Sequence, residues 1–496
     1  MALVYNKLWK LLVERNISKK ELCELADLSK VMISRLEKNK TVMTDNLDRI
    51  CEALNCDIGD IASYIPYDRN ENRLFFRMNS FFAGIGGFDV AFERQGFQTV
   101  FLCEINDYCI SILKKHWPNI NIDTDICELK SSMIPNAEVW CGGFPCQDIS
   151  VARGAAERKG LNGSQSGLFY QYANLINEKK PEVVIIENVE GLFNSNGGRD
   201  FGVILKRMTS MGYAVAWRLL NSRYFGVPQS RPRIYLCCWK NNPYNALASI
   251  FDSNGAFKPT EGARKDFITE SPGSAGFPKV PRVSYCLAAT SGRHTGTDWS
   301  RTYVVCDDGV RRMTPLEYER LQGFPDNWTE PEKTGLNVDD VDTLRYKAIG
   351  NAVSVPVVEW IAAKVYANLV ADRCIKMTQE EIMGYVPEFK KSTWSKEKLS
   401  KTDFTDASHK HSWPKAGIAW QDSYIGGNVP PTPHELIDTK LIDVIEKQKV
   451  AVRYYLTPNA AEGILRRVDN QGRTLFPPLR KALEIEMKKV KGDSDE

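Results

Sequence analysis

The spacing of apolar and polar residues differs between two parts of this chain. In residues 1–66, apolar side chains recur at helical spacing over short stretches, and Ser18 with Glu21 forms a capping-box pattern at the start of the second stretch. Short helices separated by tight turns make a helix-turn-helix pattern. We therefore predict a small all-α domain whose third helix runs from about Ser29 to Lys38, followed by helices near 46–54 and 58–64.

After a polar linker at residues 67–74, strand-length apolar runs alternate with helical patterns. This alternation predicts an α/β domain at 75–372, in which a mainly parallel sheet is covered by helices on both faces. A segment at 241–308 interrupts this alternation of strands and helices and is rich in Gly, Pro, Ser, Thr and Asn. The predicted strands lie near 74–82, 99–105, 138–144, 183–188, 214–221 and 233–239, and the predicted helices near 168–178, 201–211, 314–322 and 355–370.

The last part of the chain, residues 373–496, is predicted to be a partly helical C-terminal extension. Residues 375–430 are polar with scattered aromatic side chains and are expected to be partly extended. Helical patterns follow at about 433–449 and 458–488. The chain has no internal repeat, so a solenoid is excluded.

Composition narrows the choice of partners and compartment. The formal net charge is only +3 over 496 residues, so any surface for nucleic acid must be a local patch. Thirteen cysteines and five histidines show no regular ligand spacing, which argues against a zinc site or a disulfide framework. No apolar run reaches the roughly 18 residues of a membrane span, and the N-terminus lacks a signal-peptide pattern. We expect a cytoplasmic protein with no metal and no membrane partner.

A glycine-rich turn runs from Phe82 to Gly87, after a predicted strand and before a predicted helix. Glycines let the backbone approach a ligand closely, and the helix start offers free amide donors. The turn alone could be a plain strand–helix connection. A nucleotide site also needs a carboxylate after the next strand to hold ribose hydroxyls, and Glu104 fits that position. Asp125, in the following loop, could approach an adenine edge.

A second motif, Pro145-Cys146-Gln147, follows the strand predicted at 138–144. Cysteine is the best nucleophile near neutral pH once its pKa is lowered, whereas most other cysteines of the chain are expected to be inert. The proline fixes the backbone before the thiol. The loop at 148–167 carries several glycines, Arg153, Arg158 and Lys159, and is suited to close over a phosphate backbone.

Two further motifs place charge at strand ends. Glu187 lies in Glu-Asn-Val at the end of a predicted strand, where open α/β sheets bind ligands, and a partly buried carboxyl can act as an acid. Arg231 and Arg233 precede another strand and point to one face of an extended segment. A structural hydrogen bond for Glu187 and a solvated arginine pair are the plainer alternatives.

In their order along the chain, these segments resemble the DNA (cytosine-5) methyltransferase family of phage and bacteria. The resemblance covers about residues 75–370 and includes Gln229-Ser-Arg-Pro-Arg233, Arg312–Glu317 and Ile349–Val353. It implies a Rossmann-like, S-adenosylmethionine-dependent methyltransferase domain with a small target-recognition region at 241–308. The substrate implied is double-stranded DNA, from which a cytosine is flipped.

The resemblance also implies a role for each matched residue. Phe82 would stack on the adenine of S-adenosylmethionine, Glu104 would hold the ribose and Asp125 would meet the adenine amino group. The position after Glu104 often carries a large aromatic residue in this family, and here it is Ile105. The expected cofactor set is Phe82, Ala83, Gly84, Gly86, Gly87, Glu104, Ile105, Asp125, Ile126, Pro145, Asn351 and Ala352.

The catalytic roles implied by the resemblance centre on Cys146, which would attack C6 of the cytosine. Glu187 would contact N3 and the exocyclic amine, and Arg233 would reach O2. Arg231 would support the catalytic loop and the nucleophile. The expected catalytic set is Cys146, Gln147, Glu187, Arg231 and Arg233.

The N-terminal stretch ELCELADLSKVMISRLEKNK resembles the DNA-binding domains of Cro and the phage repressors. A small protein-interaction module is the alternative. The domain could regulate the chain's own promoter or hold the enzyme near its targets. The expected DNA contacts are Lys30, Ser34, Arg35 and Lys38 in this domain, with Ser150, Arg153 and Arg293 in the methyltransferase domain.

The C-terminal extension resembles one found on some phage-type members of the family. Its basic cluster could contact DNA, or it could be the solvated face of helices packed on the core, and the sequence leaves both open. The cluster comprises Arg466, Arg467, Arg473 and Arg480.

Two other functions remain as alternatives at this stage. One is an RNA (tRNA) cytosine-5 methyltransferase on the same catalytic domain, which the N-terminal DNA-binding pattern disfavours. The other is a DNA-binding regulator with an inactive methyltransferase domain, which the retained catalytic residues disfavour. We expect a methyltransferase domain that acts as a monomer, in a restriction-modification or phage-protection setting with a cognate restriction endonuclease.

Overall fold

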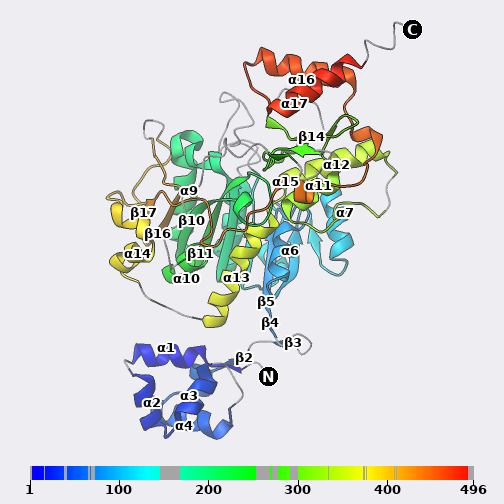
Figure 1. Ribbon diagram of the computed structural model, residues 1–496. Helices are drawn as coiled ribbons and strands as arrows, with labels where there is room; N and C mark the ends of the chain where they lie inside the picture. Colours follow the sequence, from blue (N-terminus) through cyan, green and yellow to red (C-terminus); the bar gives the residue numbers. More distant parts are fainter. Residues whose placement is uncertain are drawn as a thin grey trace, which may run out of the picture.

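The computed structural model describes residues 3–15, 17–37, 42–64, 67–68, 73–145, 168–252, 269–270, 278–290, 300–332, 335–372, 375, 377–406, 408 and 410–489. Figure 1 shows the N-terminal helices apart from the rest of the chain, which is built around a long twisted sheet. A short hairpin, β3 (Tyr67–Asp68) with β4 (Arg73–Leu74), stands in the predicted linker and leads into the first strand of that sheet.

The N-terminal domain is a cluster of short helices. The capping box predicted at its second helix is present, since the Ser18 hydroxyl accepts from Glu21 N at 3.2 Å and the Glu21 carboxylate accepts from Ser18 N at 2.7 Å. Leu8, Leu22 and Leu36 are fully buried between the helices. The helices are α1 (Asn6–Glu14), α2 (Lys19–Leu25), α3 (Lys30–Glu37), α4 (Thr44–Leu54) and α5 (Ile58–Ile61).

The helix predicted at 58–64 is shorter in the structure. It ends at Ile61 because the chain becomes extended at Ala62, and β2 (Ser63–Tyr64) then pairs with β1 (Leu3–Val4). Pairing with the start of the chain thus replaces the last helical turn.

The main sheet has nine strands in the order β17-β16-β10-β11-β9-β8-β5-β6-β7. Four strand pairings are parallel and four are antiparallel, so "mainly parallel" describes only one half of the sheet. The parallel half is β5 (Phe76–Phe81), β6 (Phe97–Cys103), β7 (Ile122–Asp123), β8 (Val139–Gly142) and β9 (Val183–Val189), and the other half is β10 (Tyr213–Asn221), β11 (Pro232–Lys240), β16 (Ala416–Trp420) and β17 (Ser423–Gly427).

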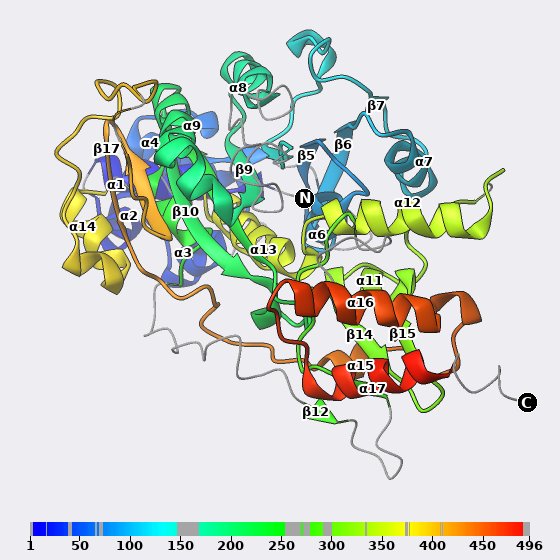
Figure 2. The ribbon, with the colours of Figure 1, turned by 90° about the horizontal axis from the view of Figure 1, so that it is seen from above.

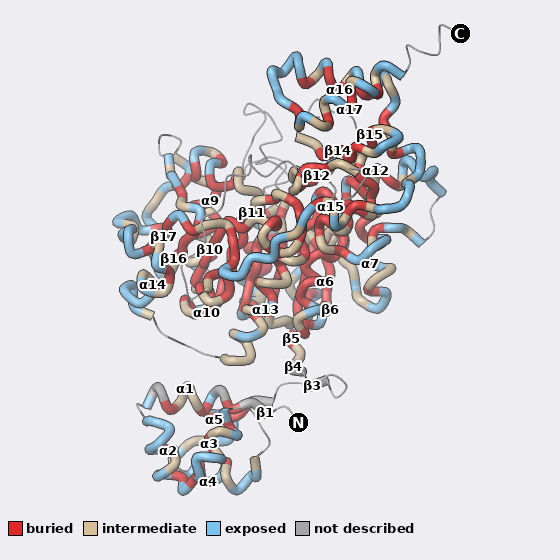
Figure 3. The backbone as a smooth tube through the Cα atoms, in the orientation of Figure 1, coloured by how far each residue is buried: buried red, intermediate tan, exposed pale blue. Residues whose placement is uncertain are grey.

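Helices cover both faces of this sheet, as the apolar strands require. Side chains alternate between two cores, with Val139 and Cys141 in one and Trp140 in the other. The first core includes side chains of α6 (Gly87–Glu93), α7 (Asp107–His116), α10 (Pro243–Ala248) and α13 (Val355–Ala371), and the second those of α8 (Leu168–Lys179) and α9 (Arg199–Ser210). Figure 3 shows the buried strands between these exposed outer layers.

A second, four-stranded antiparallel sheet is formed by three strands of the region predicted to recognise the target, 241–308, and by one strand just after it. Figure 2 shows the last two helices lying over its strands. It is followed in the chain by α11 (Pro315–Gln322) and α12 (Val338–Asn351). The strands are β12 (Thr269–Glu270), β13 (Lys279–Val280), β14 (Tyr303–Val305) and β15 (Val310–Arg312), and the last two helices are α16 (Pro458–Asn470) and α17 (Pro477–Lys488).

The C-terminal extension differs most from prediction. Residues 375–430 contribute α14 (Gln379–Tyr385), strand β16 and the edge strand β17. The helix predicted at 433–449 is wrong, because only α15 (Leu441–Val444) forms there. Backbone groups of this stretch bond to distant segments instead: Ile437 N donates to Tyr224 O at 3.2 Å, and Leu441 N donates to Arg282 O at 2.8 Å.

Within the described ranges, no single helix has the length and apolar character to cross a bilayer, although the bent pair α12–α13 passes that test when taken together.

Candidate active site at the strand ends

The predicted site residues follow the carboxyl ends of neighbouring parallel strands. The glycine-rich turn follows β5, Glu104 follows β6, and Asp125 lies just beyond β7. Pro145 comes after β8, and Glu187 lies near the end of β9. Because these strands are neighbours in the sheet, their loops meet along one edge, where open α/β sheets bind ligands. We call this row the ligand edge.

The glycine-rich turn is held against Glu104. Ala83 N donates to Cys103 O at 3.0 Å, and Gly84 N donates to the Glu104 carboxylate at 2.7 Å. The other carboxylate oxygen of Glu104 accepts from Asn106 N at 2.8 Å. Two backbone donors therefore fix the Glu104 side chain beside the turn, as the prediction of a joint site requires.

Gly84 has a φ of +58°, and a Cβ at this position would meet nothing within 4 Å. Open space therefore lies beside the turn at this residue. Gly86, by contrast, has no such space, since its Cβ would lie 2.4 Å from the Trp117 ring. Gly84 therefore borders open space, whereas Gly86 is packed against Trp117.

The other predicted cofactor residues fall into exposed and buried groups. Phe82 is half-buried and lies edge-on to Tyr172, with ring centroids 6.0 Å apart. Ile105 is 69% exposed, an unusual state for a large apolar side chain beside a carboxylate. Asp125 accepts from Cys127 N at 2.8 Å. The side chain of Ile126 is buried in the apolar core.

Glu187 is the acidic centre of the other half of the ligand edge. Its carboxylate lies 3.0 Å from Arg233 Nε, and it lies 3.3 Å from where a Cβ of Gly143 would stand. The carboxyl therefore adjoins the residues that lead to Pro145. Burial raises the pKa of Glu187, although the charges of Arg233 and Arg231 oppose that rise. A carboxyl in this state holds a proton more readily than an ordinary glutamate does.

Arg231 is a structural hub, with 2% of its surface exposed. Its guanidinium donates to the carbonyls of Leu287 at 2.9 Å, Gly350 at 3.0 Å and Ala352 at 2.7 Å. Burial, together with the neighbouring charge of Arg233, lowers the pKa of Arg231. Arg231 thus connects residues 350–352, which include the exposed Asn351, to Leu287 in the segment between β13 and β14.

Cys286 was missed by the sequence reasoning. Its Sγ lies 3.6 Å from Arg231 Nη1 and 3.9 Å from Arg233 Nη2. Burial alone would raise the pKa of this thiol, but the two guanidiniums lower it below its usual value. No local signal marks this cysteine, because the arginines lie more than 50 residues earlier in the chain.

Several predicted residues lie outside the described part of the chain. These are Cys146, Gln147, Ser150, Arg153, Arg293 and Lys38. In α3 of the N-terminal domain, Ile33 and Leu36 face the core, whereas Lys30, Val31 and Arg35 are exposed. The predicted DNA-contacting side chains that the structure describes therefore stand on or beside the outer face of this helix.

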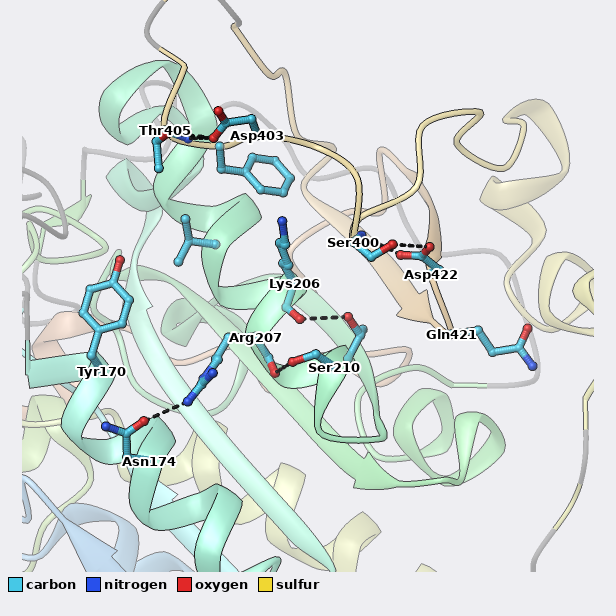
Figure 4. Close-up of a pocket in the computed structure, with 13 residues that line it drawn as sticks. Tyr170, Asn174, Lys206, Arg207, Ser210, Ser400, Asp403, Thr405, Gln421 and Asp422 are labelled. Carbon is cyan, nitrogen blue, oxygen red and sulfur yellow. Dashed lines mark hydrogen bonds between the residues drawn. The ribbon is translucent and has the colours of Figure 1, made fainter.

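A cavity of about 650 Å³ lies elsewhere, between α8, α9 and residues 400–422. Figure 4 shows its polar side chains bonded to one another, such as Arg207 to Asn174 and Ser400 to Asp422. None of the predicted site residues lines it. The ligand edge, where the motifs converge, is therefore the candidate site.

Comparison with known proteins decides the family. Residues 76–274 and 277–367 match the family described as "C-5 cytosine-specific DNA methylase". The chain belongs to this family. Residues 7–67 match the Cro/C1-type helix-turn-helix DNA-binding domain. Both resemblances predicted from the sequence are thus confirmed, and this methyltransferase carries a DNA-binding domain at its N-terminus.

Two relatives named as type II methyltransferases agree with this assignment. The "Type II methyltransferase M2.BsuMI" of Bacillus subtilis is 31% identical over 312 residues, which is 57% of this chain and 73% of the relative. The "Type II methyltransferase M.HhaI" of Haemophilus parahaemolyticus is 27% identical over 323 residues, or 59% and 95% of the two chains. Among solved structures, an Entamoeba histolytica methyltransferase, EhMeth, aligns with a TM-score of 0.45 at 18% identity, covering 60% of this chain and 99% of its own.

This protein is therefore a DNA (cytosine-5) methyltransferase, and the α/β fold predicted for its central domain is confirmed. The family match to a DNA methylase and the N-terminal DNA-binding domain favour this function over RNA methylation or an inactive regulator.

Proposed function

We propose that this methyltransferase uses S-adenosylmethionine to methylate C5 of a cytosine flipped out of a short duplex sequence, with Cys146 as the nucleophile. The observation that carries the proposal is the position of Glu187. Its carboxyl has a raised pKa, lies 3.0 Å from Arg233, and adjoins Gly143 in the segment that leads to Pro145 and Cys146. An acid and a cation at this point match the needs of a cytosine ring under nucleophilic attack.

The ligand edge fits a nucleoside-like cofactor. Glu104 is fixed by two backbone donors, open space lies beside Gly84, and the apolar side chain of Ile105 is exposed next to them. Glu104 would hold ribose hydroxyls, and Phe82 and Ile105 would lie against the adenine. S-adenosylmethionine bound here supplies an electrophilic methyl group.

The chain's own residues activate the cytosine. The Cys146 thiolate adds to C6, which makes C5 nucleophilic. Glu187 in its protonated form donates to N3 and neutralises the charge that develops on that side of the ring. Arg233 polarises O2, and Arg231 positions Arg233 and the Gly350–Ala352 turn rather than touching the base. Loss of the C5 proton to a base then allows the bond between Cys146 and C6 to break.

The cytosine must leave the duplex for this chemistry, at a cost of a few kcal/mol. We assign target recognition to residues 241–308, and DNA contacts to the loop that contains Ser150 and Arg153 and to Arg293. Relatives named as type II methyltransferases motivate a restriction-modification setting in the bacterial cytoplasm, with a cognate endonuclease as partner.

We assign the N-terminal domain to binding the chain's own promoter, through the exposed outer face of α3. In the full chain, Arg35→Ala together with Lys30→Ala should abolish promoter retention in a mobility-shift assay while leaving DNA methylation unchanged. If the pair of substitutions instead lowers methylation and leaves promoter binding intact, the domain serves to hold the enzyme at its targets.

The proposed chemistry is tested by bisulfite sequencing of DNA from a host that expresses the chain. The wild-type chain should protect one short sequence, Cys146→Ala should protect none, and Cys23→Ala in the N-terminal domain should match the wild type. Calorimetry should show that Cys146→Ala still binds S-adenosylmethionine. Undiminished methylation by Cys146→Ala would refute the proposed nucleophile.

A further inference from the structure

The small sheet of the recognition region has two apolar faces. Side chains alternate along β14, so Tyr303 and Val305 point to one side and Val304 to the other. Val304 and Val280 belong to the core of the methyltransferase domain. Tyr303 and Val305, with Val310 of β15, belong to a different cluster. The sheet therefore needs a cover on the side away from the catalytic body.

Helices α16 and α17 form that cover. Ile464, Leu479 and Leu483, which are 0%, 4% and 0% exposed, pack in one cluster with Tyr303, Val305 and Val310. These helices follow the sheet by about 150 residues in the chain, yet Figures 1 and 2 both show them lying over β14 and β15. The small sheet is thus closed by the end of the chain.

Polar bonds tie the helix pair to the same two strands. Leu456 N, just before α16, donates to Val310 O at 2.8 Å, and Tyr455 forms a bridge with Arg311. After α17, Lys489 Nζ donates to Asp308 O at 3.0 Å in the β14–β15 turn. Both ends of the helix pair are therefore anchored on one hairpin of the recognition sheet.

The sheet also continues into the segment that holds the two active-site arginines. Tyr285, Tyr303 and Leu479 line one small gap, and Tyr285 N donates to the Thr302 hydroxyl at 3.0 Å. One residue beyond Cys286, Leu287 O accepts from Arg231 at 2.9 Å. Residues 285–287 therefore extend from the gap beside α17 to the guanidinium group of Arg231.

We propose that α16 and α17 are the second half of the target-recognition unit. They fix the small sheet against the catalytic body, and through residues 285–287 they set the positions of Arg231 and Arg233. Target choice and turnover on duplex DNA then both depend on packing supplied by α16 and α17. This inference rests on the proposed assignment of residues 241–308 to target recognition.

The charges of the helix pair favour packing over direct DNA contact as its role. Arg480 is paired with Asp469 at 2.8 Å and with Glu484 at 3.1 Å, and Lys489 is paired with Glu486 at 2.8 Å. Arg466 and Lys481 are exposed on the side away from the sheet. The basic cluster noted in the sequence is thus partly neutralised within the helix pair.

Leu483→Ala in the full chain tests the proposal. Leu483 and Leu399 are 0% and 1% exposed, but Leu399 belongs to a core cluster of the main sheet, so Leu399→Ala is a matched control for lost stability. We expect Leu483→Ala to bind S-adenosylmethionine normally, to methylate at least about tenfold more slowly, and to modify additional sequences in bisulfite maps, because small misplacements of catalytic groups cost rate steeply. Leu399→Ala should modify only the wild-type sequence. All assays are run below the melting temperatures of both variants.

Equal rates and identical sequence maps for Leu483→Ala and the wild type would overturn the inference. So would a changed map for the double variant Arg466→Ala/Lys481→Ala with none for Leu483→Ala, since that result would assign the helices to direct DNA contact. If the wild-type chain itself leaves duplex cytosines unmethylated, the proposed function fails instead, and the two failures are therefore distinguishable.

Discussion

Two regions of this methyltransferase bury a carboxylate beside an arginine: the ligand edge, and the part of the chain around β15 and α11, which we call the recognition side. The carboxylates of the two regions differ in how many hydrogen-bond partners compensate their charge. On the recognition side, Arg311 and Glu317 are 2% and 0% exposed and form two bonds of 2.9 and 2.8 Å. The same carboxylate accepts from Thr314 N at 2.9 Å and from Glu446 N at 2.8 Å. This pair is saturated with partners.

At the ligand edge, by contrast, Glu187 has a bond of 3.0 Å to Arg233, and both side chains keep 13–14% of their surface exposed. Its pKa stays raised. Saturated buried networks specify structure, whereas groups held in an incompletely compensated state are typical of functional sites. The difference separates a fully compensated pair that stabilises the fold from a carboxyl that is only partly compensated, and it predicts that substitution lowers stability in the first region and rate in the second.

Among substitutions of the charged residues in these two regions, the largest effect on rate is expected at Glu187. Glu187→Gln keeps the size of the side chain but removes the transferable proton, so kcat should fall by about 10²–10⁴-fold. Because the pKa of Glu187 is raised, the wild-type rate should fall as pH rises through that pKa, and the variant should lose this dependence. Steady-state methylation across a pH series measures both. A rate within threefold of the wild type would show that the carboxyl takes no part in proton transfer.

The largest effect on stability is expected at Arg311. Arg311→Met leaves the Glu317 carboxylate buried without its cation, which should lower the free energy of unfolding by about 3–5 kcal/mol. Arg320→Met is the matched control, because Arg320 and Asp326 form an exposed pair worth less than about 1 kcal/mol. Urea denaturation measures both variants. Equal losses in the two would contradict the contrast between the regions.

Substitution of Glu104 should weaken cofactor binding and change the stability of the fold little. Glu104→Ala removes the acceptor of two backbone donors and the partner proposed for the ribose, so the Kd for S-adenosylmethionine should rise by about 10–100-fold. Titration calorimetry measures the change. Glu128→Ala, which changes an exposed acid in the loop after β7, should leave the Kd as it is, and an unchanged Kd for Glu104→Ala would remove the ribose assignment.

A smaller, pH-dependent effect is expected at Asp89, behind the glycine-rich turn. This fully buried carboxyl accepts from Ser80 at 3.0 Å and Thr99 at 3.2 Å, and burial raises its pKa to about 7. The folded protein then holds a proton here that the unfolded chain releases near pH 4, so stability falls as pH rises from about 4 to 7. The melting temperature of Asp89→Asn should exceed that of the wild type by a few degrees at pH 8 and by less at pH 5. A difference independent of pH would contradict the raised pKa.

The ligand edge could be predicted from the sequence because each of its motifs is a short stretch of neighbouring residues. The turn at Phe82–Gly87, the carboxylate of Glu104 and the motif at Glu187 each follow a readable strand, and parallel strands bring their ends together. Cys286 could not be predicted, because its environment is created by arginines far away in the chain.

The C-terminal extension was predicted least well for the same physical reason. Its strands β16 and β17 complete the main sheet, and its helices α16 and α17 cover the small sheet. Neither placement is encoded in local periodicity. At 433–449, helical periodicity was overridden because backbone donors such as Ile437 N and Leu441 N bond to other segments.

The central claim is that a thiolate at position 146 forms a transient bond to C6 of cytosine. A duplex in which the target cytosine carries fluorine at C5 tests this most directly, because the intermediate cannot then lose the C5 substituent. Incubated with S-adenosylmethionine, the full chain should become covalently attached to this duplex, and mass spectrometry should place the bond on Cys146. Absence of any attachment, with methylation of the ordinary duplex intact, would contradict the account.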